Sequence, residues 1–153
     1  MDSFIYLFRI YKAMVRISNL ELIRLLKENS RISFVKLAEH FKVSETAVRK
    51  RVKKLEKEGV IKRYTIEVDP RKMGFEINAL IGIDTKPEYY IPTIEKLKKM
   101  QEVIGMYSAS GDHMILVECW LKNSEELAKF IKIIEEIEGV VRVCPAIILE
   151  KIK

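Results

Sequence analysis

The feature that most constrains the fold is a run of three short helical patterns, each beginning just after a serine. These serines are Ser18, Ser33 and Ser44. A serine hydroxyl at this position accepts a hydrogen bond from a backbone N–H that the first helical turn leaves without a partner. We expect helices over about 19–29, over 34–41, and from residue 45 to Gly59. With a turn of about four residues between the last two, this pattern predicts a helix-turn-helix unit.

The third helix combines an apolar side with a strongly basic one. Val48, Val52 and Leu55 recur at i, i+4 and i+7 and are therefore expected to face the interior. Between Glu45 and Arg63 there are eight basic residues against three acidic ones. An α-helix fits the major groove of DNA, and the N-terminal part of a recognition helix meets the base edges. The agreement of cap, turn, spacing and charge favours DNA binding over a merely solvated basic face.

The candidate DNA-contacting residues lie on the exposed side of this helix and just beyond it. They are Ser44, Glu45, Thr46, Arg49, Lys50, Lys53, Lys54 and Arg63. Of these, Thr46, Arg49 and Lys50 are candidates for reading base edges. Glu45 can accept a hydrogen bond from a cytosine amine. The three remaining basic residues are better placed for phosphate, which adds affinity and salt dependence without sequence information.

The second half of the chain alternates β-rich segments with two helices. Strands are expected at 78–85, 103–108, 114–121 and 140–148, and helices at 90–100 and 127–137. The order β-α-β-β-α-β is that of a ferredoxin-like sandwich with its helices on one face of the sheet. Pro145 falls within the last strand and favours an edge position or a bulge there. The whole chain is thus predicted to be α+β, with a winged-type three-helix domain first and the sandwich second.

The segment between these halves alternates as a strand does, at Tyr64–Val68, and Gly74 marks a hinge. We therefore divide the chain into a helix-turn-helix domain at 18–63, with its motif at about 34–53, a hinge strand and linker at 64–77, and a sandwich domain at 78–153.

The first seventeen residues precede this pattern and have an apolar side of their own. Their apolar residues recur at helical spacing, at Phe4, Leu7, Phe8, Tyr11 and Val15. We expect an amphipathic extension over 1–17 that packs on its own protein or on a partner subunit, with a basic membrane-surface helix as the alternative. Met14 is a second candidate for the natural start.

Charge is divided unevenly between the two halves. Residues 1–74 hold 18 Lys and Arg against 9 Asp and Glu, whereas residues 75–153 hold 10 against 13. This asymmetry suggests a polyanion-binding module joined to one with a different task, although two solvated surfaces would look the same. Two cysteines, Cys119 and Cys144, exclude a disulfide scaffold and are too few for a structural zinc site.

Nothing else in the sequence indicates an enzyme, a bound cofactor or a metal. Neither of the glycine-rich phosphate-binding motifs is present, and no apolar run reaches the roughly 18 residues of a membrane span. His113 beside Asp112 is more typical of a turn than of an acid–base pair. We therefore expect a soluble, cytoplasmic protein without catalytic residues, cofactor or metal.

The stretch from Arg31 to Gly74 resembles the DNA-binding half of the Lrp/AsnC family, the feast/famine regulators of bacteria and archaea. The resemblance is carried by R-I-S, L-A, V-S followed by a basic helix, and L-E-x-x-G-V-I followed by a tyrosine-bearing hinge strand. Residues 78–153 resemble the amino-acid-sensing domain of the same family. The resemblance implies a regulator that binds double-stranded DNA and forms a homodimer through its C-terminal sheets. It also implies assembly of such dimers into tetramers or octamers, with an amino acid bound between dimers.

The family's effector loop has a glycine, any residue, an aromatic residue or histidine, and then an aspartate before an apolar strand. The matching residues here are Ser110, Gly111, Asp112, His113 and Met114. Backbone N–H groups beside Gly111 can hold an effector carboxylate. Because Met114 stands where the family usually has aspartate, one expected partner for an effector's ammonium is missing. A loop that senses an amino acid or related small metabolite and a loop that serves assembly alone both fit the sequence.

Together these features predict a sequence-specific transcriptional regulator. A symmetric dimer favours a pseudo-palindromic operator with half-sites one or more helical turns apart, each about 10 base pairs. Two alternatives are a haem-biosynthetic decarboxylase, which resembles the same two-domain fold, and an architectural DNA-binding protein of low sequence specificity. The enzyme has no need for a groove-facing basic stripe.

Overall fold

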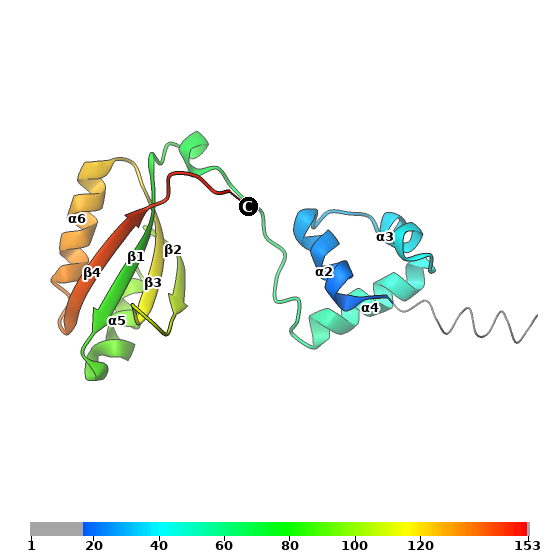
Figure 1. Ribbon diagram of the computed structural model, residues 1–153, viewed down its shortest axis with the longest axis horizontal. Coiled ribbons are helices and arrows are strands. Elements are labelled where there is room, and N and C mark those ends of the chain that lie inside the picture. Colours follow the sequence, from blue (N-terminus) through cyan, green and yellow to red (C-terminus); the bar gives the residue numbers. More distant parts are fainter. Residues whose placement is uncertain (1–16, 153) are drawn as a thin grey trace, which may run out of the picture. The chain divides into compact units, whose positions relative to one another are not determined.

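A computed structural model describes residues 17–152, which divide into two compact units between Glu67 and Val68 (Figure 1). The extension expected over residues 1–17 lies outside the described residues, except for Ile17. That residue is buried and belongs to the core of the first unit.

The first unit contains three helices, α2 (Asn19–Glu28), α3 (Phe34–Phe41) and α4 (Glu45–Lys57). Each is capped by the serine expected from the sequence. The Oγ atom of each serine accepts a hydrogen bond from the backbone N–H three residues further on, at 3.2–3.3 Å. These caps explain why the helices begin where they do, because each supplies an acceptor for a donor that the first turn cannot pair.

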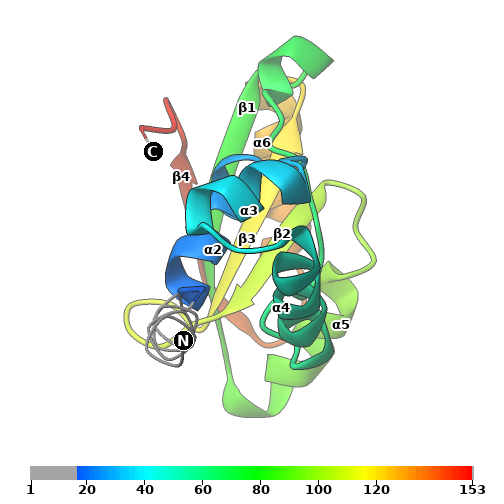
Figure 2. The same ribbon diagram turned by 90° about the vertical axis from the view of Figure 1, so that its right-hand side faces the viewer.

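A tight turn of Lys42, Val43 and Ser44 joins α3 to α4. Lys42 adopts a left-handed conformation with φ 53°, and the Val43 N–H donates to the Ala38 carbonyl at 3.0 Å. This conformation ends α3 and redirects the chain, so that the axes of α3 and α4 cross (Figure 2). The crossing is stabilised by a common core in which Leu22, Leu37, Val48, Val52 and Leu55 are buried, as the spacing of the α4 residues predicted.

The prediction of a strand at Tyr64–Val68 is wrong, because these residues form no strand in the structure. The segment keeps its alternation, and its central apolar side chain, Ile66, is 80% exposed. A hydrogen-bonded ladder needs a second backbone, which an alternating pattern cannot supply by itself. Tyr64 instead donates a hydrogen bond from its hydroxyl to Glu56 Oε1 on α4, at 2.8 Å. A short 3-10 turn, Pro70–Met73, follows this segment.

The second unit is an antiparallel sheet with two helices. Its elements are β1 (Ile77–Thr85), α5 (Tyr90–Leu97), β2 (Val103–Ser108), β3 (Ile115–Leu121), α6 (Ser124–Glu135) and β4 (Val140–Ile147). The strand order is β2-β3-β1-β4. The expected order of elements is therefore confirmed, and Pro145 lies in an edge strand. The backbone irregularity does not lie at Pro145, which pairs with Ile81, but nearer the start of β4, where Asp84 and Thr85 of β1 pair with Arg142 and Val140.

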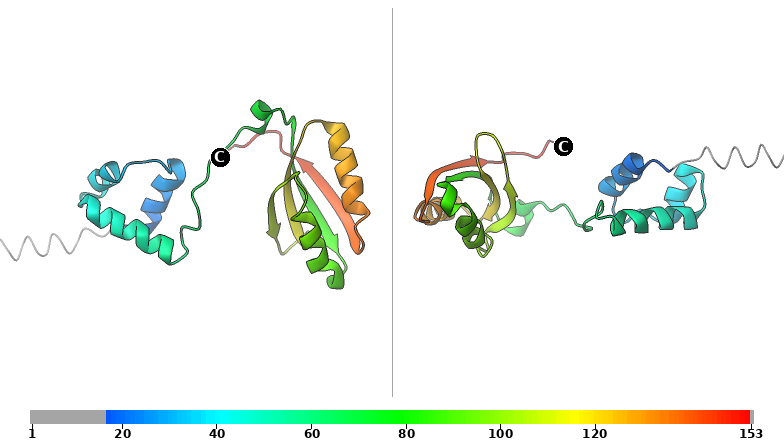
Figure 3. Two further views of the ribbon diagram at one scale, coloured as in Figure 1. Left: turned by 180° about the vertical axis from the view of Figure 1, so that it is seen from behind. Right: turned by 90° about the horizontal axis from the view of Figure 1, so that it is seen from below.

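Both helices pack on one face of this sheet (Figure 3). Alternate residues of the strands point toward them, and Ile81, Val117 and Ile134 are fully buried in the resulting core. On the opposite face, Leu80 and Leu116 are only half-buried. This face, which neither α5 nor α6 covers, is called the open sheet face below.

Candidate functional site

The exposed side of α4 carries the predicted DNA-contacting residues. All eight of them, including Ser44 before the helix and Arg63 beyond it, are exposed. The opposite side of α4 is buried against α2 and α3, so the helix is held firmly by its apolar residues. Thr46 and Lys50 are four residues apart and therefore share one exposed face. The helix thus presents polar and basic side chains from a rigid support.

Arg49 is held by two neighbours. Its guanidinium donates a short hydrogen bond to Glu45, one turn earlier, and its Cζ atom lies 4.7 Å from the centre of the Phe34 ring at the start of α3. A guanidinium over an aromatic face is attracted by the ring's electron density. For Arg49 to reach a guanine, or Glu45 a cytosine, this pair has to open. In this structure, Arg49 and Glu45 are thus engaged with each other.

The phosphate candidates are also exposed but less constrained. Lys54 Nζ lies 3.6 Å from Glu58 Oε1, and both side chains face solvent. Such an exposed pair contributes about 0–1 kcal/mol and does not hinder exchange for a phosphate. Lys53 and Arg63 extend the positive surface toward the end of the helix and beyond it.

The predicted effector loop, residues 110–114, connects β2 to β3 and lies against the sheet. Ser110, Gly111 and Asp112 are exposed, whereas His113 and Met114 are partly buried. The His113 ring lies directly on the backbone of Gly82 in β1. A Cβ atom built on that glycine would lie only 2.2 Å from His113 Cδ2. A glycine is therefore required at position 82 for the ring to lie where it does.

Two residues that sequence reasoning missed, Asp84 and Arg142, hold the loop in place. Asp84 Oδ2 accepts a hydrogen bond from Arg142 Nε at 2.7 Å and lies 3.0 Å from His113 Nδ1. Asp84 Oδ1 accepts from the Met114 N–H at 2.9 Å. Asp112 completes the cluster, with Oδ1 3.1 Å from Arg142 Nη2 and Oδ2 3.1 Å from His113 Nε2.

Asp84 is the electrostatic centre of this cluster. Partial burial alone would raise the pKa of its carboxyl, but the hydrogen bonds from Arg142, His113 and the Met114 amide together lower that pKa below its ordinary value. The hydrogen bonds of Arg142 to Asp84 and to Asp112 raise the pKa of its guanidinium. The only sequence signal for Asp84 was a charged residue at the end of an apolar strand. Its partner Arg142 could not be identified without the register of β1 against β4.

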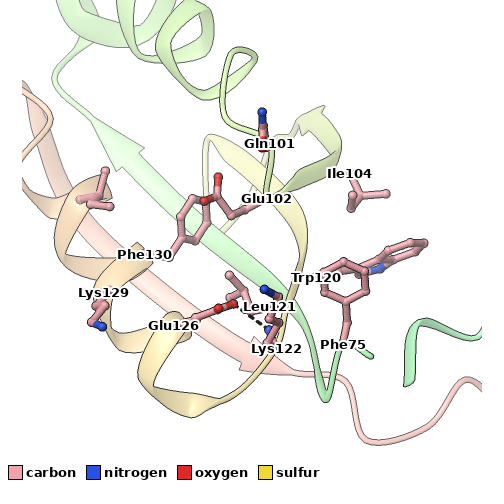
Figure 4. Close-up of a pocket in the computed structure, with 11 residues that line it drawn as sticks. Phe75, Gln101, Glu102, Ile104, Trp120, Leu121, Lys122, Glu126, Lys129 and Phe130 are labelled. Carbon is pink, nitrogen blue, oxygen red and sulfur yellow. Dashed lines mark hydrogen bonds between the residues drawn. The ribbon is translucent and has the colours of Figure 1, made fainter. Parts of the chain in front are cut away.

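A separate open pocket of about 590 Å³ lies elsewhere on the second unit (Figure 4). Phe75 and Trp120 line one part of it, with ring centres 5.9 Å apart, and Phe130 of α6 lines another. No predicted effector residue lines this pocket. Among residues 17–152, no helix is long and apolar enough to cross a membrane, and no cluster of three or more His, Cys, Asp or Glu is placed to hold a metal ion.

Two family models match the chain. Residues 16–62 match a winged helix-turn-helix DNA-binding domain, and residues 78–153 match the Lrp/AsnC ligand binding domain. The second match begins within β1 and includes the whole cluster around Asp84. The matches therefore place α4 in a DNA-binding domain and the effector loop in a ligand-binding one.

Known proteins resemble the chain along most of its length. HTH-type transcriptional regulator LrpA of Pyrococcus horikoshii is 45% identical over 133 residues, covering 86% of this chain and 94% of the relative. LysM of Saccharolobus solfataricus, also an HTH-type transcriptional regulator, is 38% identical over 135 residues, covering 86% and 92%.

Solved structures agree. E. coli AsnC matches with a TM-score of 0.75 and 26% identity, covering 90% of this chain and 95% of that one. The feast or famine regulatory protein of M. tuberculosis, solved in complex with L-methionine, matches with a TM-score of 0.76 and 26% identity, covering 86% and 90%. The chain therefore belongs to the Lrp/AsnC family of helix-turn-helix transcriptional regulators.

Proposed function

We propose that this chain regulates transcription by reading the major groove of a pseudo-palindromic operator with α4, under the control of an amino acid or related small metabolite. The observation that carries the proposal is the construction of α4, which buries one side in the core and exposes the predicted contact residues on the other. A helix held in this way can present several side chains to base edges at once.

The contacts are proposed to divide along the helix. Thr46 and Lys50 read base edges, and Arg49 joins them when its pair with Glu45 opens. Lys53, Lys54 and Arg63 bind phosphates, together with the N-terminal end of α4 at Ser44. The proposed DNA-binding domain is 18–63, and 64–77 links it to the domain at 78–153.

The proposed partner on the open sheet face is a second copy of the chain. That face carries half-buried Leu80 and Leu116, and Tyr107 on β2 is 56% exposed. Apolar side chains gathered on an uncovered sheet face are typical of an interface. A Leu116→Glu variant should shift the protein to a lower oligomeric state in sedimentation, whereas Lys132→Glu on α6 should not. An unchanged state for Leu116→Glu would contradict the proposed interface.

The effector proposal rests on the ligand-binding domain and on the loop at 110–114. The M. tuberculosis relative is described in complex with L-methionine, which supports an amino acid as the class of ligand. The protein is proposed to act in the cytoplasm, where it has access to its operator. It is proposed to act as a dimer, or as a tetramer or octamer built from dimers.

Selection from a random library of DNA duplexes tests the proposed reading of sequence. We expect enrichment of one inverted repeat with half-sites about 10 base pairs, or a multiple of that, apart. The selected duplex should then bind at least about 1,000-fold more tightly than a scrambled one. Equal binding to both would support an architectural protein and overturn sequence-specific regulation, and absence of binding at low salt would overturn the assignment of α4.

A further inference from the structure

A side chain at the start of α3, Phe34, lies against a predicted base-reading residue of α4. The Phe34 ring is half-buried and packs on the core of the helical unit. The preceding residue, Ser33, accepts a hydrogen bond from the Lys36 N–H at 3.2 Å, which fixes the first turn of α3. The Cζ atom of Arg49 lies 4.7 Å from the centre of the ring. The aromatic support of Arg49 therefore comes from outside α4 and is itself held in place.

Arg49 also has an acidic partner within its own helix. It lies one turn after Glu45 and donates a hydrogen bond from Nη2 to Glu45 Oε1. Both side chains are exposed, so the pair itself contributes little to stability and can open at small cost. Glu45 and Arg49 thus place an acceptor and a set of donors side by side on the exposed surface of α4.

The polar groups of this pair match those of one base pair in the major groove. Guanine presents two neighbouring acceptors, O6 and N7, which fit the fork of a guanidinium, and cytosine presents an amine donor at N4. When the pair opens on a G·C base pair, Arg49 exchanges the carboxylate for guanine, and Glu45 exchanges the guanidinium for the cytosine amine. At an A·T pair, neither base presents two neighbouring acceptors, so the exchange is incomplete.

A phosphate group offers a poorer exchange. It carries negative charge and no donor, so binding of Arg49 to it leaves the Glu45 carboxylate without a partner beside the charged backbone. The Phe34 ring adds to the preference for guanine. A cation–π contact occupies none of the guanidinium N–H groups and limits the conformations of a long side chain, so less entropy is lost on binding.

We propose that Glu45 and Arg49 read one G·C base pair as a unit, with Phe34 as the positioning residue of Arg49. Arg49 contacts guanine and Glu45 contacts cytosine, while the same carboxylate opposes the capture of Arg49 by phosphate. This inference rests on the proposed reading of DNA by α4 and names the base pair that these residues recognise.

The operator selected from the random library is the substrate for the test. Fluorescence anisotropy measures the affinity for duplexes in which each G·C pair of a half-site is replaced in turn by A·T. At one such pair, the wild type should discriminate about tenfold or more, and Arg49→Ala should abolish the discrimination. Replacing that guanine with 7-deazaguanine, which lacks N7, should weaken binding of the wild type and leave binding of Arg49→Ala unchanged.

Glu45→Gln should change specific and non-specific binding differently. It removes a negative charge next to the DNA backbone, so a scrambled duplex should bind more tightly. It also removes the acceptor for the cytosine amine, so discrimination should fall at the same G·C pair that Arg49→Ala affects. Glu58→Gln is the matched control, because it removes the same charge from the exposed pair of Lys54 and Glu58 on α4. It should strengthen binding to both duplexes by one factor.

Phe34→Leu tests the positioning of Arg49. The variant keeps an apolar side chain on the core but removes the aromatic face, so discrimination at the same G·C pair should fall by about two- to fivefold. Discrimination at the other base pairs should not change, and Phe34→Tyr, which restores the ring, should recover the loss. A purely structural role of Phe34 would instead weaken discrimination at every position, because all of α4 would be displaced.

The outcomes separate this inference from the proposed function. If the library yields no preferred duplex, the reading of DNA by α4 is wrong and the G·C contact fails with it. If an operator emerges, but Arg49→Ala changes all duplexes by one factor or Glu45→Gln acts at a different base pair, the G·C unit is wrong and the proposed function stands. If Phe34→Leu weakens every position equally, its positioning role is wrong. Should Phe34→Leu unfold, as circular dichroism would show, the comparison of Glu45→Gln with Glu58→Gln decides alone.

Discussion

Replacing Gly82 with alanine should break the cluster that holds the effector loop. The added Cβ would lie 2.2 Å from His113 Cδ2 and 2.5 Å from its Cγ and Nε2, whereas carbon atoms in contact are about 3.5–4.0 Å apart. The ring must therefore withdraw by more than about 1 Å. That displacement stretches the 3.0 Å contact with Asp84 beyond hydrogen-bonding distance.

The magnitude follows from what is lost and gained. A hydrogen bond to a charged group contributes about 1.5–3 kcal/mol. The exposed contact of His113 with Asp112 adds about 0–1 kcal/mol. Replacing glycine with alanine also restricts the unfolded chain, which offsets up to about 1 kcal/mol of the lost free energy of unfolding. We expect Gly82→Ala to lower the free energy of unfolding by about 1–3 kcal/mol.

Guanidinium unfolding monitored by tryptophan fluorescence measures this loss at a fixed protein concentration. The chain has a single tryptophan, Trp120 in β3, so the signal reports on the sheet unit. Gly105→Ala is the matched control, because its Cβ would approach the end of the Glu118 side chain at 3.2 Å and would meet other atoms only at 3.5 Å or more. In a His113→Ala background, Gly82→Ala should be nearly neutral, since the clash is gone. Equal stability of the two glycine variants, or an undiminished penalty in that background, would refute the argument.

Three further predictions concern a helix cap and two titrations. Ser44→Ala should cost about 1 kcal/mol of the free energy of unfolding of the helical unit, measured by circular dichroism, because α4 loses its cap. Because the fold lowers the pKa of Asp84, its contribution to stability is complete above the ordinary carboxyl pKa and is lost as the pH falls through the lowered one. Unfolding midpoints measured from pH 7 downward should show this loss in the wild type and not in Asp84→Asn. Burial and the hydrogen bond to Glu56 raise the pKa of Tyr64 to about 12, so Tyr64→Phe should remove the tyrosinate absorbance step near that pH.

The helical unit was largely predictable because its signals are local. A serine cap and the spacing of apolar residues lie within a few positions of each other, and the bounds of α3 followed from them. The contact of Arg49 with Phe34 was not predictable, since it depends on how α4 crosses α3. The sequence therefore identified the base-reading candidates, but it did not show that Glu45 and Phe34 restrain Arg49, one of those candidates.

The sheet unit was predictable in its order of elements but not in its site. β2 has the expected bounds, whereas the cluster of Asp84, Asp112 and Arg142 joins residues that are far apart in the sequence. Only the register of β1 against β4 brings Asp84 opposite Arg142. The expected hinge strand failed for a related reason, because alternation shows which residues share a side and not which backbone pairs with them.

The central claim, that α4 reads base edges, is tested most directly by comparing Lys50→Ala with Lys54→Ala on one set of duplexes. Fluorescence anisotropy measures the affinity of each variant for the selected operator and for operators with single base-pair substitutions, across a salt series. Lys50→Ala should cost about 1–3 kcal/mol on the operator and abolish discrimination at one base pair. Lys54→Ala should weaken binding to every duplex by the same factor and reduce the salt slope by about one. If Lys50→Ala instead weakens all duplexes equally, or changes none, α4 does not read sequence as proposed here.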